Sequence, residues 1–380
     1  MRVAIATRIF DPEPSAASFR LAALAATLAD AGHEVTVLTT TPPKTARGMT
    51  PRTGYRVRRF PVLRDRTGYV RGYIQYLSFD LPLFFRILFG AKQDAIIVEP
   101  PPTTWLLARW AAGLRRTPLF VYAPDIWSDA SESARAPGFV VSTVRWMERL
   151  VCAGACGVLA VNAGVAERIQ AIAPRAKVKV VGNGIDTETF RADGGTLGPK
   201  PFIIYSGTAS EWQGAEIFVR ACAQLKEERV EVRLVFLGQG TAVNELRRLA
   251  AELHAPVDFH STVSAADAAA WLRGAVLSLA SIRPGSGYDF AFPTKIYASW
   301  ACGTPVVYAG PGPARTVFAE HPELGRGVEY DVAAVAAATR SIIEQGNHHR
   351  AEISEWAQRN VSLAGVAARV IEYVERRLGE

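Results

Sequence analysis

The chain has 380 residues and a net charge of +7; 49% of its residues are hydrophobic and 21% are charged. It has no repeat and no low-complexity tract, and this composition is typical of a soluble globular protein. Because 380 residues are too many for one ordinary hydrophobic core, we expect two domains of roughly 180 residues each.

The first segment, MRVAIATRIF, is a short strand pattern without the long apolar run of a signal peptide, so we expect a cytoplasmic protein. The four cysteines, at positions 152, 156, 222 and 302, lie on apolar segments. Cys152 and Cys156 are one helical turn apart, but no second pair of ligands accompanies them. Buried thiols in a reducing compartment are therefore expected, rather than a zinc site or a disulfide framework.

Strand-like apolar runs alternate with helical patterns along both halves of the chain, which predicts layers of parallel strands and helices. The runs in the first half are RVAIAT, HEVTVLTT, YRVRRFPV, DAIIVEP, PLFVYAP, GVLAVN and VKVVGN. The runs in the second half are PFIIYSG, VRLVFLG, VDFHS, VLSLASI and TPVVYAG. The Gly- and Pro-rich segment Arg191–Pro201 has the composition of a linker. We expect domains over 1–190 and 191–355, then a helical segment over 356–380 that can cross back to the first domain.

The positive charge is concentrated between Arg52 and Lys92. Nine basic and two acidic residues lie there, so this segment alone carries as much excess charge as the whole chain. Its arginines are mixed with Tyr, Phe and Leu, a pattern that favours contact with an anionic membrane surface. A core helix with a basic solvent face is the alternative. The apolar run Leu81–Phe89 is too short to cross a bilayer, and nucleic acid is not an expected partner because no binding motif for it is present.

Ligands of open parallel sheets bind beyond the carboxyl ends of the strands, so the loops after the apolar runs are the first candidates for a site. Gly238 and Gly240 follow one run, but Val243 stands where a dinucleotide fingerprint needs its third glycine. No GxxxxGK[ST] sequence is present either. A redox cofactor and an ATPase activity are therefore both disfavoured.

Lys295 opens an apolar helical pattern directly after Thr294, which we expect to be the N-cap. A cation is unfavourable at a helix start, where free N–H groups already carry partial positive charge. This position is explained if an anion binds there as well. A lysine side chain that lies along the surface of the helix is the alternative.

Five segments, in this order, resemble glycosyltransferase family 4. They are PEPSAASFRLAALAATLADAGHEVTVLTT (12–40), DIWSD (125–129), VVGNGIDTETF (180–190), YSGTASEWQG (205–214) and PTKIYASWACGTPVV (293–307). The resemblance is greatest to the branch that acts on bacterial polyprenyl-linked glycans and exopolysaccharides. It implies an α/β protein of the GT-B fold, in which two Rossmann-like doubly wound domains face a central cleft.

The resemblance also implies an activity. It is the transfer of a hexosyl or N-acetylhexosaminyl group, with retention, from a nucleotide sugar to an acceptor hydroxyl. A UDP-sugar donor and a lipid-linked acceptor are favoured, and no metal or other cofactor is required. The expected place is the inner face of the plasma membrane, in cell-surface glycan biosynthesis. The alternatives are a GT-B-fold sugar-nucleotide epimerase and a non-catalytic nucleotide-binding relative.

The resemblance assigns the diphosphate to Thr294 and Lys295, with Arg283 as a forked partner for a phosphate oxygen. The expected donor-binding residues are Ser15, Ala16, Gly207, Thr208, Gly238, Arg283, Tyr288, Thr294 and Lys295. Asp125 is the expected catalytic residue, as a base or as an orienting group. The alternatives are an N-cap for Ser15, a surface ion pair for Arg283 and a helix cap beside Trp127 for Asp125.

The sequence departs from the family at positions that bear on donor binding, and Ser128 stands where the element that contains Asp125 usually has a proline. Many members carry two glutamates where this chain has Phe290 and Ala298, and neither side chain can accept a hydrogen bond from a ribose hydroxyl. Gln213 stands where many members carry a lysine. Charge neutralisation would then depend on fewer residues, which adds weight to Lys295 and Arg283.

Overall fold

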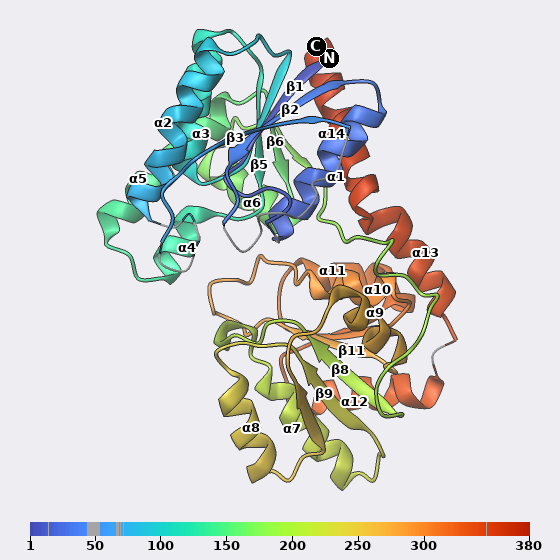
Figure 1. Cartoon of the computed structure of the whole chain (residues 1–380). Helices are drawn as coiled ribbons and strands as arrows, with labels where there is room; N and C mark the ends of the chain where they lie inside the picture. The colour runs from blue at the N-terminus through green and yellow to red at the C-terminus, as the bar shows by residue number, and fades with distance from the viewer. Residues whose placement is uncertain (14, 44–53, 66–67, 69, 71, 347) are drawn as a thin grey trace. The chain divides into compact units, whose positions relative to one another are not determined.

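The computed structural model describes residues 1–13, 15–43, 54–65, 68, 70, 72–346 and 348–380. The chain divides into two compact units (Figure 1). Unit 1 consists of Met1–Asn183 together with Leu363–Glu380, and unit 2 consists of Gly184–Ser362. Each unit contains a parallel sheet and the helices that cover it, so the predicted α/β class is confirmed.

The sheet of unit 1 has the strand order β3-β2-β1-β4-β5-β6-β7. The strands are β1 (Arg2–Ala6), β2 (Glu34–Thr40), β3 (Arg56–Phe60), β4 (Ala95–Val98), β5 (Leu119–Ala123), β6 (Gly157–Ala160) and β7 (Val178–Val180). All neighbouring pairs run parallel. The central strands β4, β5 and β6 are buried along their whole length, which explains why they are continuous apolar runs in the sequence.

Seven helices belong to unit 1. They are α1 (Ala16–Asp30), α2 (Tyr73–Phe89), α3 (Pro102–Leu114), α4 (Trp127–Ser133), α5 (Gly138–Gly154), α6 (Ala163–Ile172) and α14 (Leu363–Gly379) within the described residues. The C-terminal helix α14 packs against α1, far away in the sequence. None of the described helices is both long enough and apolar enough to cross a membrane.

The sheet of unit 2 has the strand order β10-β9-β8-β11-β12-β13, again with parallel neighbours. The strands are β8 (Phe202–Ser206), β9 (Arg233–Leu237), β10 (Val257–His260), β11 (Ser278–Ser281), β12 (Val306–Ala309) and β13 (Gly325–Val328). The α-helices are α7 (Glu216–Glu227), α8 (Val243–Glu252), α9 (Ala265–Gly274), α10 (Lys295–Ala301), α11 (Pro313–Glu320), α12 (Val332–Gln345) and α13 (Arg350–Val361). The short 3-10 helices are η2 (Glu211–Gln213) and η3 (Pro322–Leu324).

The chain passes between the units at Asn183–Gly184 rather than at the expected linker Arg191–Pro201. Ile185 is held in unit 2 because its amide donates to the Val361 carbonyl at 2.8 Å, and Phe190 packs against two core clusters of the same unit. The residues after Val361 return to unit 1. There the Tyr373 hydroxyl donates to the Lys177 carbonyl at 2.8 Å, and Arg369 Nε donates to the Val181 carbonyl at 2.9 Å.

Candidate active site

Two glycine loops pack closely at the carboxyl edge of the unit 2 sheet. Gly207 follows β8 and Gly238 follows β9, with φ values of 107° and 144°. A Cβ on Gly238 would lie 2.3 Å from the Gly207 carbonyl oxygen, and one on Gly240 would lie 2.0 Å from that of Ala209. The Gly207 amide donates to the Leu237 carbonyl at the end of β9, and the Ala209 amide donates to the Gln239 carbonyl in the second loop. Glycine is therefore required for both the φ angle and the close approach of the two backbones.

Lys295 reaches this pair of loops from α10. Its Nζ atom donates to the Thr208 carbonyl oxygen at 3.1 Å and lies 3.5 Å from the centroid of the Tyr205 ring. The Tyr205 hydroxyl donates to the same carbonyl oxygen, also at 3.1 Å. The structure thus brings together Gly207, Thr208 and Lys295, which the sequence predicts, and adds Tyr205, which it does not.

The ammonium of Lys295 has no carboxylate partner among the described residues. The residue is only partly exposed, and desolvation lowers the pKa of Lys295 well below its usual value. Its neighbours are a ring face and a carbonyl oxygen, and neither carries a full negative charge. An anion bound at Nζ would restore the charged form, because an opposite charge within a few ångströms favours it.

Thr294 does not cap α10 with its side chain. The residue is already helical (φ −63°, ψ −20°) and makes no side-chain capping hydrogen bond, so this part of the prediction is wrong. The first turn is closed instead by the Ile296 amide, which donates to the Pro293 carbonyl at 3.1 Å. Thr294 is exposed beside Lys295.

Arg283 has a partner that the sequence does not reveal. Its guanidinium forms an ion pair with Glu216 in the first turn of α7. The Tyr330 hydroxyl donates to the same carboxylate at 2.8 Å. The alternative of a surface ion pair is therefore the arrangement in this structure. Tyr288 lies nearby in the fold, because its ring packs 4.6 Å from that of Trp212, whose carbonyl accepts from the Arg283 amide.

Gln213, at the position where many family members carry lysine, has a structural role. Its side chain accepts a hydrogen bond from the Ser210 amide at 3.0 Å, and Ser210 in return caps the short helix η2. Ala298 packs against the core that surrounds Phe202. Phe290 follows Asp289, whose carboxylate accepts from the Gly285 amide. Ribose recognition is therefore not assigned to any of these positions.

A buried ion pair marks the carboxyl edge of the unit 1 sheet. Arg20 on α1 pairs with Glu99, which directly follows β4. Both side chains are almost fully buried. The Arg20 guanidinium also lies 4.7 Å from the Tyr122 ring and donates to Asn183 Oδ1 at 3.5 Å. The sequence contains a signal for this pair, because an arginine interrupts the apolar face of α1 and a glutamate ends a buried strand.

Asp125 lies two residues beyond the end of β5, near this ion pair. The residue is exposed, yet the protein atoms around its carboxyl group partly desolvate it and raise the pKa of Asp125 to about 6. The charge of Arg20 opposes this rise in pKa, and the charge of Glu99 adds to it. A carboxyl group with a pKa near neutrality is suited to exchange a proton during a reaction.

Asp125 does not cap α4. The first amides of that helix are satisfied by Glu148, whose Oε1 accepts from Trp127 N at 2.7 Å and from Ser128 N at 3.3 Å. The helix-cap alternative for Asp125 is thus wrong. Ser15, by contrast, is the N-cap of α1, because its hydroxyl accepts from the Ser18 amide at 3.0 Å.

Ala16 begins α1 and is exposed next to Ser15. Within the part of the chain that the structure describes, no cluster of three His, Cys, Asp or Glu side chains could hold a metal ion. All four cysteines are free, and Cys152, Cys222 and Cys302 are buried.

Two family models match the chain and together span most of it. The glycosyl transferase 4-like domain matches residues 16–184, and the glycosyl transferases group 1 domain matches residues 200–345. The two matches correspond to unit 1 and unit 2, apart from the returning helix α14.

Two curated relatives match part of the chain. A D-inositol 3-phosphate glycosyltransferase of Xylanimonas cellulosilytica is 32% identical over 162 residues, which are 37% of each chain. A GDP-mannose-dependent alpha-(1-6)-phosphatidylinositol dimannoside mannosyltransferase of Mycobacterium tuberculosis is 28% identical over 168 residues, which are 42% of each chain. The matched part thus spans about two fifths of these relatives.

The fold extends the likeness to the whole chain. The structure of Anabaena HepE in complex with UDP is similar over 99% of this chain and 100% of that one, with a TM-score of 0.73 and 17% identity. At this identity the likeness concerns the fold. This chain therefore belongs to the glycosyltransferases of the family 4 type and has the GT-B fold.

Proposed function

We propose that this glycosyltransferase binds the diphosphate of a nucleotide sugar in unit 2 and transfers the sugar to an acceptor hydroxyl. The observation that carries the proposal is Lys295, a desolvated ammonium without a carboxylate partner among the described residues, placed against the Gly207 and Gly238 loops. Support also comes from the names of similar proteins, one of which depends on GDP-mannose and another of which was solved with UDP.

In the proposed reaction, the bond between the anomeric carbon and the diphosphate oxygen breaks, and the acceptor oxygen bonds to that carbon. Attack from the same face retains the configuration, and the acceptor proton passes to the leaving diphosphate. Lys295 lowers the barrier because its charge stabilises the negative charge that develops on the leaving group. The glycine loops keep the backbone close to the phosphates and hold them in position. The mechanism uses no metal ion or other cofactor.

Arg283 and the remaining donor residues have supporting roles in this proposal. A phosphate oxygen would have to share the Arg283 guanidinium with Glu216, so we assign it a smaller contribution than Lys295. Thr294 and Tyr288 flank the site through their neighbours Lys295 and Trp212. We propose a UDP-sugar as donor, and GDP-mannose is the alternative.

On the acceptor side, we propose that Asp125 orients the hydroxyl or accepts its proton before that proton passes to the leaving diphosphate. The buried Arg20–Glu99 pair fixes the charges near it. Ser15 caps α1, and the small residue Ala16 leaves the start of that helix exposed, so both remain candidates for contact with donor phosphate.

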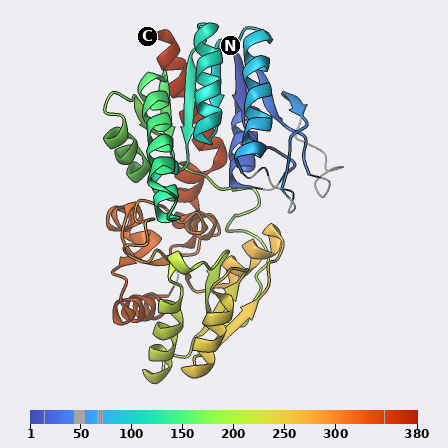
Figure 2. The ribbon, with the colours of Figure 1, turned by 90° about the vertical axis from the view of Figure 1, so that its left-hand side faces the viewer.

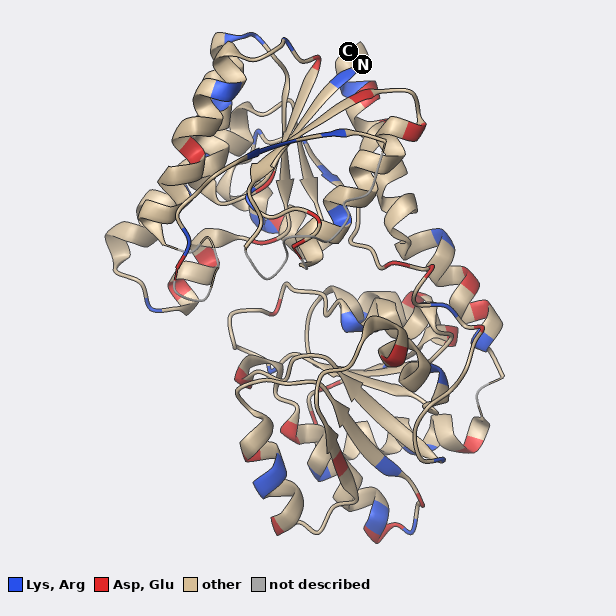
Figure 3. Ribbon diagram, viewed as in Figure 1, with Lys and Arg blue, Asp and Glu red and all other residues tan. Residues whose placement is uncertain are grey.

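A lipid-linked acceptor at the membrane is supported by the surface of unit 1. Figure 2 shows α2, α3 and α5 side by side, and these helices carry a set of exposed apolar side chains. They are Tyr73, Ile74, Leu77, Leu81, Phe85, Phe89, Trp110, Leu114, Phe139 and Trp146. Asp80 and Arg86 are the charged residues of α2, which is tan along most of its length in Figure 3. Such a face is suited to lie in the interfacial layer of a membrane.

The positive charge predicted for membrane contact is partly used inside unit 1. Arg59 donates to the carbonyl oxygens of Thr40 and Asp11, and Arg64 pairs with Glu13 at 3.0 Å. Arg52, Arg66 and Arg71 lie outside the described residues. The sequence attributes membrane contact mainly to the positive charge between Arg52 and Lys92. The proposal for peripheral binding at the inner face of the plasma membrane instead depends mainly on the exposed apolar side chains of α2, α3 and α5.

The function is tested by a screen of UDP-sugars and GDP-mannose for thermal stabilisation, followed by incubation with a polyprenyl-linked acceptor. We expect one donor to stabilise the protein and mass spectrometry to detect an acceptor heavier by one sugar. An altered sugar nucleotide formed from donor alone would favour the epimerase. Binding without any turnover on lipid-linked or glycan acceptors would favour the non-catalytic relative.

A further inference from the structure

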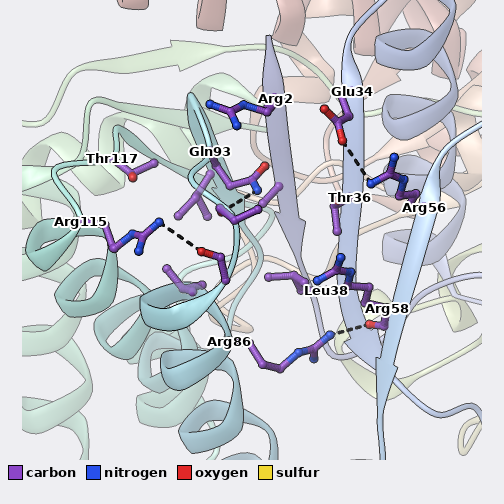
Figure 4. Close-up of a pocket in the computed structure, with 15 residues that line it drawn as sticks. Arg2, Glu34, Thr36, Leu38, Arg56, Arg58, Arg86, Gln93, Arg115 and Thr117 are labelled. Carbon is purple, nitrogen blue, oxygen red and sulfur yellow. Dashed lines mark hydrogen bonds and ion pairs between the residues drawn. The ribbon is translucent and has the colours of Figure 1, made fainter.

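A cavity of about 120 Å³ lies in unit 1 at the edge of the sheet where the strands begin (Figure 4). It is bounded by the starts of β1, β2 and β3 and by the end of α2. Asp125 follows the end of β5, so the cavity and Asp125 lie at opposite edges of the same sheet. The charged residues of its wall are Arg2, Arg56, Arg58, Arg86, Arg115 and Glu34. Five arginines thus face one carboxylate.

Three of the five arginines already have partners. Arg56 pairs with Glu34 at 3.2 Å, which neutralises the one carboxylate of the wall. Arg2 lies 4.0 Å from Asp94. Arg115 donates to two carbonyl oxygens at the end of α2, at 3.0 and 3.1 Å, and so satisfies groups that a helix end leaves free.

Arg58 and Arg86 lie next to each other, and neither guanidinium forms an ion pair with a described carboxylate. Arg86 Nη2 donates to the Arg58 carbonyl oxygen at 2.8 Å, whereas Arg86 Nη1 is buried without a hydrogen-bond partner. Desolvation, and then the positive charge of Arg58, lower the pKa of Arg86. An unsatisfied buried donor and two neighbouring like charges both destabilise this arrangement of side chains.

We propose that this cavity binds a phosphate group between Arg86 and Arg58. A phosphate oxygen at Arg86 Nη1 would satisfy the free donor, and its charge would remove the repulsion between the two guanidinium groups. The space is sufficient, because the cavity volume of about 120 Å³ is several times the roughly 10–15 Å³ that a cavity needs to hold one water molecule. The site is separate from the proposed donor site, whose lysine belongs to unit 2, and it does not depend on the proposed function.

The phosphate could belong to a phospholipid or to a soluble molecule. Phe85 and Phe89 stack on each other beside Arg86, with ring centroids 6.1 Å apart. Phe89 is 77% exposed and is followed directly by Gly90, which lines the cavity. Acyl chains could therefore contact these rings while a headgroup phosphate occupies the cavity. A free phosphate would need only the arginines.

The test uses the full chain with Lys295→Ala, so that the proposed donor site does not contribute to phosphate binding. One arm measures the Kd for inorganic phosphate by calorimetry, together with the NMR shift of the Arg86 Nε–H group. The other arm measures co-sedimentation with phosphatidylcholine vesicles that contain or lack phosphatidic acid. Arg58→Gln and Arg86→Gln are added to this background. Arg248→Gln, an exposed arginine of unit 2 in an i,i+3 pair, is the control.

We expect each of the two variants to weaken binding by at least about tenfold, which is about 1.4 kcal/mol, while Arg248→Gln leaves it unchanged. Loss in the phosphate arm identifies a soluble ligand, and loss only with phosphatidic acid identifies a lipid headgroup. Arg86→Gln also removes the hydrogen bond to the Arg58 carbonyl. If this variant does not fold, Arg58→Gln is the deciding variant, because the Arg58 side chain supports no other residue in the described structure. Binding that is absent in both arms, or unaffected by Arg58→Gln, would overturn the inference.

Discussion

Replacement of Lys295 by methionine tests the donor site sharply, because it removes the ammonium and keeps an unbranched side chain beside Tyr205. The ammonium donates to the Thr208 carbonyl and lies over the Tyr205 ring, so it is already directed at the glycine loops. A hydrogen bond to a charged group contributes about 1.5–3 kcal/mol. We therefore expect the Kd for UDP to rise about 10- to 150-fold, and the Kd for uridine, which lacks the diphosphate, to stay unchanged.

Calorimetry in two buffers with different ionisation enthalpies adds a second measurement. Because desolvation lowers the pKa of Lys295 in the free protein, a bound diphosphate should raise it, and the wild-type protein should take up protons on binding UDP. The methionine variant should take up none through this group.

The same shift predicts the direction of the stability change. Between the lowered folded-state pKa of Lys295 and its unfolded value, the unfolded chain binds more protons than the folded chain. Lys295 therefore destabilises the folded protein most at low pH, and this destabilisation becomes smaller as pH rises. Lys295→Met should raise the Tm of the unliganded protein at neutral pH. Lys226→Met is the matched control, since Lys226 donates to the His254 carbonyl at the surface of unit 2. Equal losses for UDP and uridine, or a lower Tm, would refute the reasoning.

Four further predictions follow from other parts of the site. Asp125→Asn should lower kcat and leave the donor Kd nearly unchanged. The wild-type rate should fall as pH drops through about 6, the raised pKa of Asp125, and the variant should lose this dependence. Gly238→Ala should lower the free energy of unfolding by at least about 1–3 kcal/mol and weaken UDP binding, because the added Cβ meets the Gly207 carbonyl. Gly195→Ala is the control. It should change neither stability nor UDP binding, because its Cβ meets no atom. Arg20→Ala should cost about 3–5 kcal/mol in denaturant unfolding, because it leaves the buried Glu99 unpaired. Phe89→Ser should reduce vesicle co-sedimentation with no loss of Tm, and unchanged sedimentation would remove this residue from the membrane face.

Much of the fold could be predicted from the sequence, because parallel strands that are buried on both faces must be apolar throughout. Each predicted run corresponds to a strand, and β13 was missed because its sequence GRGV has no apolar run. The boundary at Asn183 could not be predicted from composition. It depends on Ile185 and Phe190, which contact residues that are distant in the sequence.

The positions of the candidate site residues were predictable where the reason is local. Gly207, Gly238 and Lys295 are typical of a phosphate-binding edge because they follow strands or open a helix. The partners were not predictable, because they come from other elements. Glu216 pairs with Arg283 across 67 positions, and Glu148 caps α4 in place of Asp125 from 21 positions away. A sequence pattern identifies which side chains can act, but the pairing of charges depends on tertiary structure.

The central claim is that Lys295 binds the donor diphosphate. A crystal structure of the protein with UDP tests it most directly. The account predicts a phosphate oxygen within about 3.2 Å of Lys295 Nζ, with the diphosphate against the Gly207 and Gly238 loops. A diphosphate bound elsewhere, with Lys295 still donating only to the Thr208 carbonyl, would contradict it.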